Sequence, residues 1–373
     1  MSFSNTIGQH KIKRDLVQLV DADRIPHAML FLGPAGSGKL ALAMGLAQYV
    51  LCTERKGGTI CRTCKHCLKA QKLVHPDMHF SYPTIGTNRV STSFIVQWRS
   101  AVLENPYLSI NQWLQTIGAE NKQGNINKEE CLRIIKQLSL KSFESDYKIL
   151  ILWLPEYLQK EGNRLLKLIE EPPEKTIFIL VAESAERILN TILSRCQIVK
   201  FPALSDEMIL EHLVEKEKVS KEQAAAAAHL ANGNYNEALT LLRETENDNA
   251  NLFLDWMRKC YKGNGAELVP WAEQFAKLGR ERQKYFFQYG LHFIRELMVY
   301  LLTGKETVRL RTPELNTAKN LAKVVSFEQI EPISDLFNEC SYFIERNANA
   351  KILGLDASIR MHQIFNRRRS VVR

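Results

Sequence analysis

Residues 27–39 read HAMLFLGPAGSGK, and this stretch decides the fold. Residues 27–32 form a short apolar run that predicts a buried strand, and residues 40–52 have helical character. The segment between them matches the pattern G-x-x-x-x-G-K, in the strand–loop–helix context of a phosphate-binding loop. Glycines let backbone N–H groups turn inward around a phosphate, and the N-terminus of the following helix favours negative charge. The residues expected to contact nucleotide phosphates are Gly33, Gly36, Ser37, Gly38 and Lys39.

The position after Lys39 departs from the pattern. A serine or threonine hydroxyl normally coordinates Mg²⁺ here, but this chain has Leu40, whose aliphatic side chain cannot bind a hard cation. A second loss follows the apolar run 147–152, where acidic residues would orient the metal and the attacking water. Trp153-Leu154 stands there instead, and Glu156 lies too far along to replace them. We expect no hydrolysis and no Mg²⁺ at this site, while binding of ATP or ADP without turnover stays open.

Strands and helices alternate in the first part of the chain. Two further apolar runs, residues 147–152 (YKILIL) and 176–182 (TIFILVA), predict buried strands, and residues 163–170 between them look helical. Pro172-Pro173 ends that helix. Alternation of this kind implies a parallel sheet covered by helices on both faces. The expected fold class is therefore an α/β P-loop domain, followed by helical parts.

The later part of the chain looks entirely helical. Residues 205–214 and 221–242 have helical character, and Ser220 with Gln223 fits a capping box at the second start. A chain of 373 residues is also too long for one compact core. We expect a P-loop domain over 1–203, a small helical lid over 204–247 and an all-α C-terminal domain over 248–373. An apolar stripe at helical spacing is predicted to form core of the last domain: Ile330, Ile333, Phe337, Cys340 and Ile344.

Four of the eight cysteines lie close together, in the spacing C-x8-C-x2-C-x2-C over residues 52–67. Four thiolates match the tetrahedral preference of Zn²⁺ and leave no open position for a catalytic water, so the role would be structural. An iron–sulfur cluster and free thiols are the competing interpretations. His66 and His75 are reserve ligands. The predicted zinc ligands are Cys52, Cys61, Cys64 and Cys67.

The composition is that of a globular protein with a net charge of +9, which suits a polyanionic partner such as nucleic acid without requiring one. No apolar run reaches membrane-spanning length, and the N-terminal residues lack the apolar region of a signal peptide. We therefore expect a cytoplasmic protein with no membrane partner.

A further motif, Thr191-Ile192-Leu193-Ser194-Arg195-Cys196, follows the third predicted strand. Together with the phosphate loop it resembles the AAA+ clamp-loader family, and in particular the delta-prime-type subunits of bacterial DNA polymerase III. The stretch 163–173 (NRLLKLIEEPP) is the most specific match, and the cysteines inserted after the loop helix are similar too. Shorter matches are Ile7-Gly8-Gln9, residues 24–28 (RIPHA) and His75-Pro76-Asp77. The resemblance covers most of the first two expected domains and only loosely the third.

The resemblance implies that Arg195 is an arginine finger that acts in trans on ATP held by a neighbouring subunit. A guanidinium spreads positive charge over phosphate oxygens as negative charge develops there. The alternative is a structural arginine paired with a nearby carboxylate. Two more departures from active relatives fit a subunit that does not hydrolyse ATP: Glu183 at a sensor position and Asn236 where active relatives have arginine.

The resemblance also implies partners. They are motor subunits of the gamma/tau type, the delta subunit, a sliding clamp, and primer–template DNA through the assembly. The subunits would form a hetero-pentamer, joined by a collar of helical C-terminal domains, that loads the clamp during DNA replication.

Two other functions stay open. An active AAA+ motor subunit of the same loader would hydrolyse ATP as an isolated chain, and Leu40 with Trp153-Leu154 argues against it. A zinc-containing nucleic-acid-binding protein with a relic P-loop would bind DNA alone, with a steep salt dependence.

Overall fold

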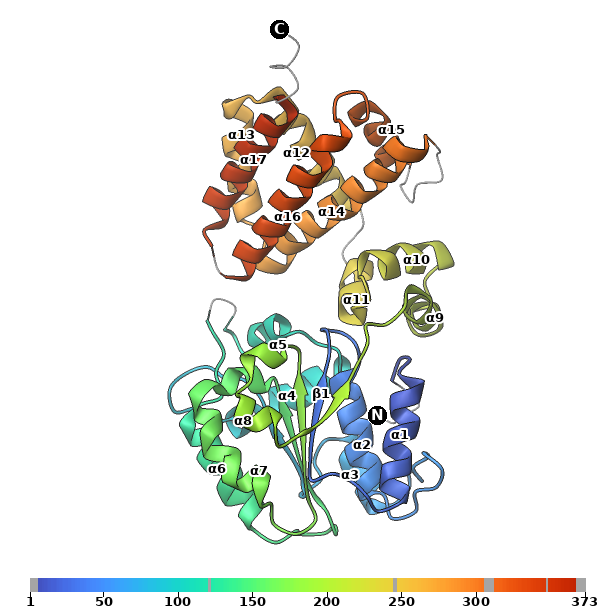
Figure 1. The fold of residues 1–373 in the computed structure, drawn as a ribbon, viewed down its shortest axis with the longest axis vertical. Helices are drawn as coiled ribbons and strands as arrows, with labels where there is room; N and C mark the ends of the chain where they lie inside the picture. Colours follow the sequence, from blue (N-terminus) through green and yellow to red (C-terminus); the bar gives the residue numbers. More distant parts are fainter. Residues whose placement is uncertain (1–5, 120–121, 244–246, 305–311, 347, 367–373) are drawn as a thin grey trace. The chain divides into compact units, whose positions relative to one another are not determined.

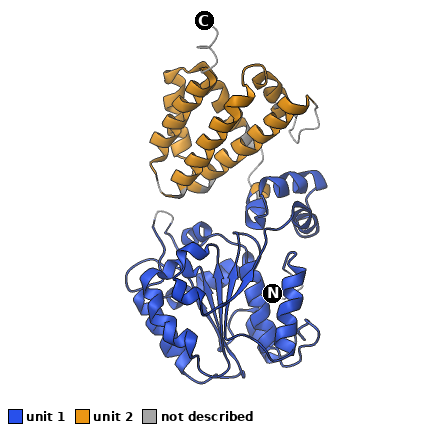
Figure 2. Cartoon of the chain, in the orientation of Figure 1, with its two compact units in different colours: residues 1–240 blue, residues 241–373 orange. Residues whose placement is uncertain are grey.

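The computed structural model describes residues 6–119, 122–243, 247–304, 312–346 and 348–366. The chain forms two compact units, residues 1–240 and 241–373 (Figure 2), which are described separately below. The helices that were expected to form a separate lid belong to the same compact unit as the sheet. The second boundary lies within a few residues of the expected one, and the three-domain division itself stays a prediction.

Unit 1 is built on a parallel five-stranded sheet in the order β2-β3-β4-β1-β5 (Figure 1). The strands are β1 (Ala28–Leu32), β2 (Met78–Ser81), β3 (Lys148–Trp153), β4 (Thr176–Ala182) and β5 (Gln197–Lys200). All three predicted strands are confirmed, because long runs of buried apolar residues mark β1, β3 and β4. The two edge strands have four residues each and were not predicted. The predicted α/β fold class is confirmed.

Helices cover both faces of this sheet, as Figure 1 shows. Met29 and Phe31 of β1 pack into the core cluster that includes helix α2, whereas Ala28 and Leu30 point into the opposite cluster with α6. This alternation is the two-residue period of a strand with two buried faces. The helices are α1 (His10–Asp21), α2 (Lys39–Leu51), α3 (Lys65–Gln71), α4 (Ile95–Glu104), α5 (Ile110–Thr116), α6 (Lys128–Ser139), α7 (Leu166–Glu170) and α8 (Asn190–Leu193). Short 3₁₀ segments are η2 (Ser91–Phe94), η3 (Pro155–Leu165) and η4 (Ala185–Arg187).

Three more helices follow in the chain: α9 (Asp206–Glu217), α10 (Lys221–Leu230) and α11 (Tyr235–Arg243), whose last residues lie past the end of unit 1 at Thr240. The capping box of Ser220 and Gln223 is present at the start of α10, as predicted. Gly233, with a φ of +85°, separates α10 from α11. A left-handed backbone of this kind favours glycine, and it divides the expected helical stretch 221–242 into two helices.

The described part of unit 2 is entirely helical, as predicted. Its elements are α12 (Asn247–Lys262), α13 (Gly265–Ala276), α14 (Arg280–Thr303), α15 (Thr312–Leu321), η5 (Phe327–Gln329), α16 (Ile330–Glu345) and α17 (Ala350–Asn366). The predicted stripe on α16 is buried in the aromatic-rich core of this unit, which confirms the core interpretation. Trp256 donates its Nε1–H to Oγ of Ser358 at 2.9 Å inside that core.

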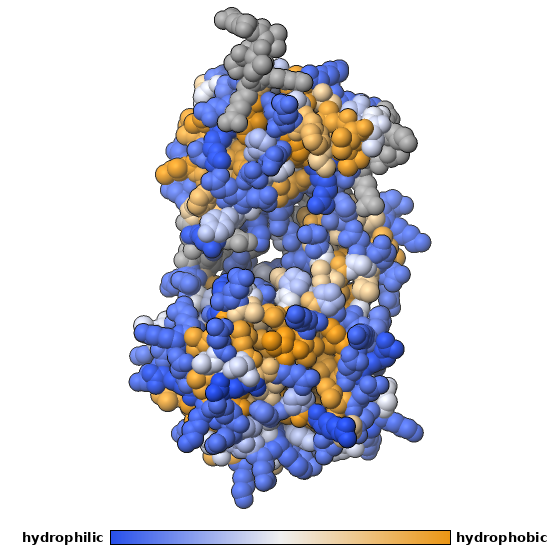
Figure 3. Space-filling model, in the orientation of Figure 1, coloured by the Kyte–Doolittle hydropathy of each residue, from blue (hydrophilic) through white to orange (hydrophobic). Residues whose placement is uncertain are grey.

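The surface in Figure 3 mixes hydrophilic and hydrophobic side chains on both units. Among the described residues, no helix combines the length and the apolar character that crossing a membrane would need.

Candidate functional site

The phosphate-binding loop joins β1 to α2, as the sequence predicts. Gly36 and Gly38 have φ values of +68° and +88°, a conformation that the two glycines adopt without strain. Lys39 is the first residue of α2, but its ammonium group turns back onto the loop. Nζ donates to the carbonyl oxygen of Pro34 and lies 3.3 Å from Oγ of Ser37. The lysine therefore binds an acceptor of its own loop at the place where phosphate oxygens would be bound.

Burial changes the acid–base chemistry of this lysine. Lys39 is 5% exposed, and the cost of burying its charge lowers its pKa from 10.5 to about 8, although Glu183 and Glu156 act in the opposite direction. Near neutral pH the loop thus carries a buried positive charge that the two nearby carboxylates offset only in part.

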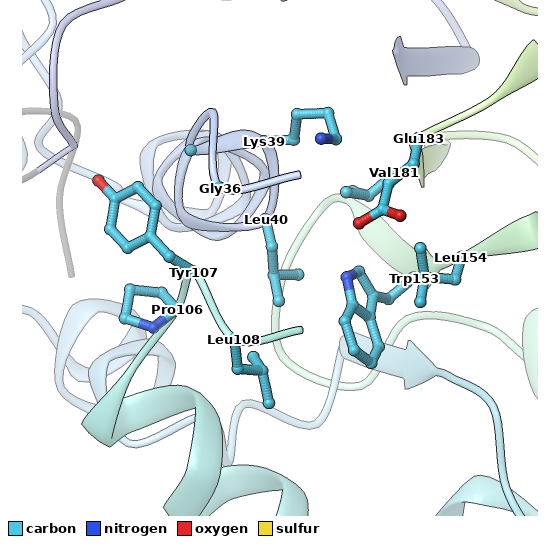
Figure 4. Close-up of a pocket in the computed structure, with 11 residues that line it drawn as sticks. Gly36, Lys39, Leu40, Pro106, Tyr107, Leu108, Trp153, Leu154, Val181 and Glu183 are labelled. Carbon is cyan, nitrogen blue, oxygen red and sulfur yellow. The ribbon is translucent and has the colours of Figure 1, made fainter. Parts of the chain in front are cut away.

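Apolar side chains fill the expected metal position. A pocket of about 310 Å³, including open solvent at its mouth, is lined by Leu40, Leu108, Trp153 and Leu154 next to Lys39. Figure 4 shows Leu40 pointing into the space between Leu108 and Trp153. The Trp153 ring is 4% exposed and lies 5.2 Å from the ring of Trp98. Mg²⁺ requires oxygen ligands in near-octahedral geometry, and Leu40, Trp153 and Leu154 supply none, which leaves Glu183 as the carboxylate among the lining residues.

Glu156 has a structural role at the neighbouring strand end. Its Oε1 accepts hydrogen bonds from the backbone N–H groups of Glu183 at 2.5 Å and Ser184 at 2.9 Å. These donors directly follow β4, so the carboxylate holds the end of that strand. This contact agrees with the expectation that Glu156 does not replace the missing acidic pair, while Glu183 lines the pocket.

Residues from two distant segments cover the phosphate-binding loop. A Cβ atom on Gly36 would lie 1.8 Å from Oδ1 of Asn234, and a Cβ on Gly38 would lie 3.3 Å from Cε1 of Tyr107. The hydroxyl of Tyr107 also accepts the backbone N–H of Ile7 at 3.0 Å. Side chains of the protein thus occupy the outer face of the loop.

The same segments connect the sheet domain to helix α11. Asn105 donates Nδ2–H to Oδ1 of Asn236 at 2.6 Å, and the rings of Tyr107 and Tyr235 meet edge to face at 4.8 Å. We call these two contacts the 105–236 bridge. Sequence analysis identified Asn236 but missed Asn105 and Tyr107, because no local pattern distinguishes them.

Arg195 follows the short helix α8 and turns back toward its own chain. Its Nη2 forms an ion pair with Oε1 of Glu170, and its Nη1 donates to the carbonyl oxygen of Thr191 at 2.8 Å. Glu170 is thus the nearby carboxylate that the alternative interpretation, a structural arginine, would need. Arg195 is not among the residues that line the pocket around Lys39.

The four cysteines meet where α2 ends. Their sulfur atoms lie within 4.8 Å of one another, with 3.6 Å between Cys52 and Cys61 and 3.9 Å between Cys61 and Cys67. Zn–S bonds of about 2.3 Å in a tetrahedron place sulfur atoms about 3.8 Å apart, so the set fits one Zn²⁺ ion. Since α2 has 13 residues, this site lies about 20 Å from the phosphate-binding loop.

Backbone N–H groups support this cysteine cluster. The N–H of Cys64 donates to the sulfur of Cys61 at 3.3 Å, and that of Cys67 donates to the sulfur of Cys64 at 3.4 Å. Burial opposes ionisation of Cys64, but such hydrogen bonds lower its pKa to about 6. Burial raises the pKa of Cys52 and Cys67, so a bound metal would displace protons from these two thiols.

The two reserve histidines lie beside the cysteine site and bind each other. Nδ1 of His66 and Nε2 of His75 are 2.8 Å apart, and Nδ1 of His75 accepts the N–H of Asp77 at 3.1 Å. The proton between the rings therefore belongs to Nε2 of neutral His75. A metal-bound histidine normally donates its second ring N–H, which this arrangement does not allow for His75.

Comparison with known proteins agrees with this geometry. The sequence model of the family described as "DNA polymerase III, delta subunit" matches residues 8–205, which is 198 of the 373 residues. The chain belongs to this family. The match covers the phosphate-binding loop, the cysteine site and Arg195, and it confirms the predicted resemblance to clamp-loader delta-prime subunits.

Among similar proteins of known name, the delta-prime subunit of DNA polymerase III from Bacillus subtilis is 29% identical over 239 residues, which cover 64% of this chain and 60% of the relative. The gamma/tau subunit from Mycoplasma pneumoniae is 27% identical over 340 residues, which cover 85% of this chain and 44% of the relative. The chain thus spans about 60% or less of the length of these two relatives. A solved gamma subunit-related protein of DNA polymerase III from Thermotoga maritima aligns over 94% of this chain and 99% of its own, with 13% identity and a TM-score of 0.39.

Proposed function

We propose that this chain is a delta-prime-type clamp-loader subunit that does not hydrolyse ATP itself and supplies Arg195 in trans to the ATPase site of a neighbour. The proposal that the chain does not hydrolyse ATP rests on Leu40 and Trp153, two apolar residues that line the pocket where metal ligands would be expected. Loss of the metal removes the main stabilisation of charge in phosphoryl transfer. The proposal that Arg195 acts in trans is supported by the family match and by the exposure of the Arg195 side chain, which is 31% accessible to solvent.

The phosphate-binding loop is proposed to hold neither ATP nor ADP. Lys39 is bonded within the loop, and Asn234 with Tyr107 covers its outer face. A nucleotide would have to break these contacts without the metal that normally adds to its affinity. Titration of the isolated chain with a fluorescent ADP analogue tests this directly, and saturable micromolar binding would contradict it.

The proposed cofactor is one structural Zn²⁺ on the four cysteines. Their sulfur atoms lie within 4.8 Å of one another, which leaves room for a single ion rather than an iron–sulfur cluster. The proposed partners are gamma/tau-type motor subunits, the delta subunit, the sliding clamp and primer–template DNA, in a hetero-pentamer. Residues 248–373 would supply its collar, with 204–247 as a lid on the AAA+ domain.

The test is ATP turnover by a loader reconstituted from this chain, motor subunits, delta and clamp with primer–template DNA. Arg195→Ala is expected to lower turnover by about 10³-fold or more at the one ATPase site that Arg195 serves. The total turnover of the loader should therefore fall by the fraction that this site contributes. Lys39→Ala is expected to leave turnover unchanged. Arg14→Ala, at an exposed arginine on α1, controls for loss of charge. Unchanged turnover with Arg195→Ala, in loaders that assemble normally, would refute the proposal.

An active motor subunit is the second candidate, because the gamma/tau relative aligns with more of this chain than the delta-prime relative does. ATP hydrolysis by the isolated chain, abolished by Lys39→Ala, would establish it.

A further inference from the structure

The guanidinium of Arg195 is held on its own chain by three contacts. Nη2 pairs with Oε1 of Glu170, the last residue of α7, and Nη1 donates to the carbonyl oxygen of Thr191 at 2.8 Å and to Oγ of Ser194 at 3.2 Å. A bond to the backbone four residues earlier means that the side chain runs back along α8. We call the ion pair of Arg195 and Glu170 the resting pair.

This resting position leaves one donor unsatisfied. Nε of Arg195 is buried and has no hydrogen-bond partner among the described residues. A buried N–H without an acceptor costs free energy, which lowers the cost of leaving this position. The side chains of the resting pair are 31% and 45% exposed, so water and salt weaken their attraction.

A polyphosphate is a stronger partner for the same guanidinium. It presents several negative charges and pairs of oxygen atoms that match the planar N–H groups of arginine, whereas Glu170 uses one oxygen atom and carries one charge. An approaching nucleotide triphosphate on a neighbour would therefore displace the carboxylate.

We propose that Glu170 regulates the finger: it holds Arg195 against α7 and α8 in the free subunit and releases it to the polyphosphate of a neighbouring subunit. This inference rests on the proposed function of Arg195. Glu170 contacts no reacting atom in this scheme and acts only by competing for the guanidinium.

The free full-length chain gives the first test, using an arginine-selective dicarbonyl reagent and mass spectrometry of the peptide that contains Arg195. Glu170→Gln keeps the size of the side chain but removes its charge, and it is expected to speed modification of Arg195 by up to about fivefold, the range for an exposed ion pair. Raising the salt concentration should speed modification in the native chain and not in the variant. The matched control is Glu171→Gln, because this neighbour is exposed and forms no ion pair with any residue that the structure describes.

The reconstituted loader gives the second test, at ATP concentrations below saturation. Glu170→Gln is expected to raise turnover by up to about fivefold, and Glu171→Gln to leave it unchanged. Modification of Arg195 that does not respond to Glu170→Gln overturns the inference. Turnover that falls with Glu170→Gln also overturns it, because Glu170 would then position the finger. If Arg195→Ala itself has no effect, the proposed function fails, whatever the labelling of the free chain shows.

Discussion

Replacing Lys39 with methionine should change how the stability of unit 1 depends on pH. Burial lowers the pKa of Lys39 from 10.5 to about 8, and one pKa unit corresponds to about 1.36 kcal/mol, so burying the charge costs roughly 3 kcal/mol at neutral pH. Between these two pKa values the unfolded chain binds more protons than the folded one, so the free energy of unfolding rises with pH. The Lys39→Met variant has no titrating group at this position, so this rise in the free energy of unfolding is missing from it. From pH 8 to pH 10 the native chain should therefore gain about 2 kcal/mol relative to the variant.

Urea unfolding at several pH values measures this difference. Trp256→Phe and Trp271→Phe in the background of both chains leave tryptophan fluorescence as a signal from unit 1 alone. Lys11→Met, at an exposed position of α1, shows what the loss of a solvated lysine does. If the difference in the free energy of unfolding between the native chain and Lys39→Met stays constant from pH 8 to pH 10, Lys39 is not buried as described. The hydrogen bond of Lys39 to Pro34 within its own loop would then be refuted.

Three further outcomes are expected. Dialysis against a chelator should remove one zinc ion per chain and Cys64→Ser should weaken zinc retention, measured by elemental analysis. Glu130→Gln should destabilise unit 1 by roughly 1–3 kcal/mol, because it removes the charge of a buried carboxylate that lies 2.7 Å from the half-buried guanidinium of Arg133. Although burial alone would raise it, the pKa of Glu130 is held below its ordinary value mainly by that arginine, so acid should weaken the native chain more than Glu130→Gln as pH falls through the folded pKa. Gly290→Ala should cost about 1–3 kcal/mol in thermal unfolding of unit 2, since its Cβ would lie 2.7 Å from two phenylalanine rings, whereas Gly265→Ala, which meets nothing within 4 Å, should not.

The sequence was most informative where a residue type at a fixed spacing carries the chemistry. The phosphate-binding loop, the loss of its metal ligand at Leu40 and the four-cysteine set all depend on spacing, and the structure brings each of these groups together. Strands β1, β3 and β4 were predictable because both of their faces are buried. Strand β5 was not, because its four residues are mostly exposed and show no apolar run.

Contacts between distant segments were not predictable. The hydrogen bond of Asn105 to Asn236 joins residues 131 positions apart. The resemblance singles out Asn236, but Asn105 belongs to no apolar period or spaced motif, so the sequence does not pair them. The same holds for the pairing of Arg195 with Glu170, since a surface carboxylate at a helix end is ordinary in any sequence. A single sequence contains no signal for such pairs, because they depend on how the sheet brings loop ends together.

The side chains that cover the phosphate-binding loop limit what single substitutions could do to restore ATPase chemistry. Restoring a hydroxyl at Leu40 and an acidic residue at Trp153 would rebuild the metal ligands, yet Tyr107 and Asn234 would still cover the loop. Each single change would place a polar group among the buried apolar side chains around Leu40 and Trp153, and so lose stability before any catalysis returned. In a subunit that functions as proposed, ATPase activity would therefore require several substitutions made together, because each one alone would lower stability without restoring catalysis.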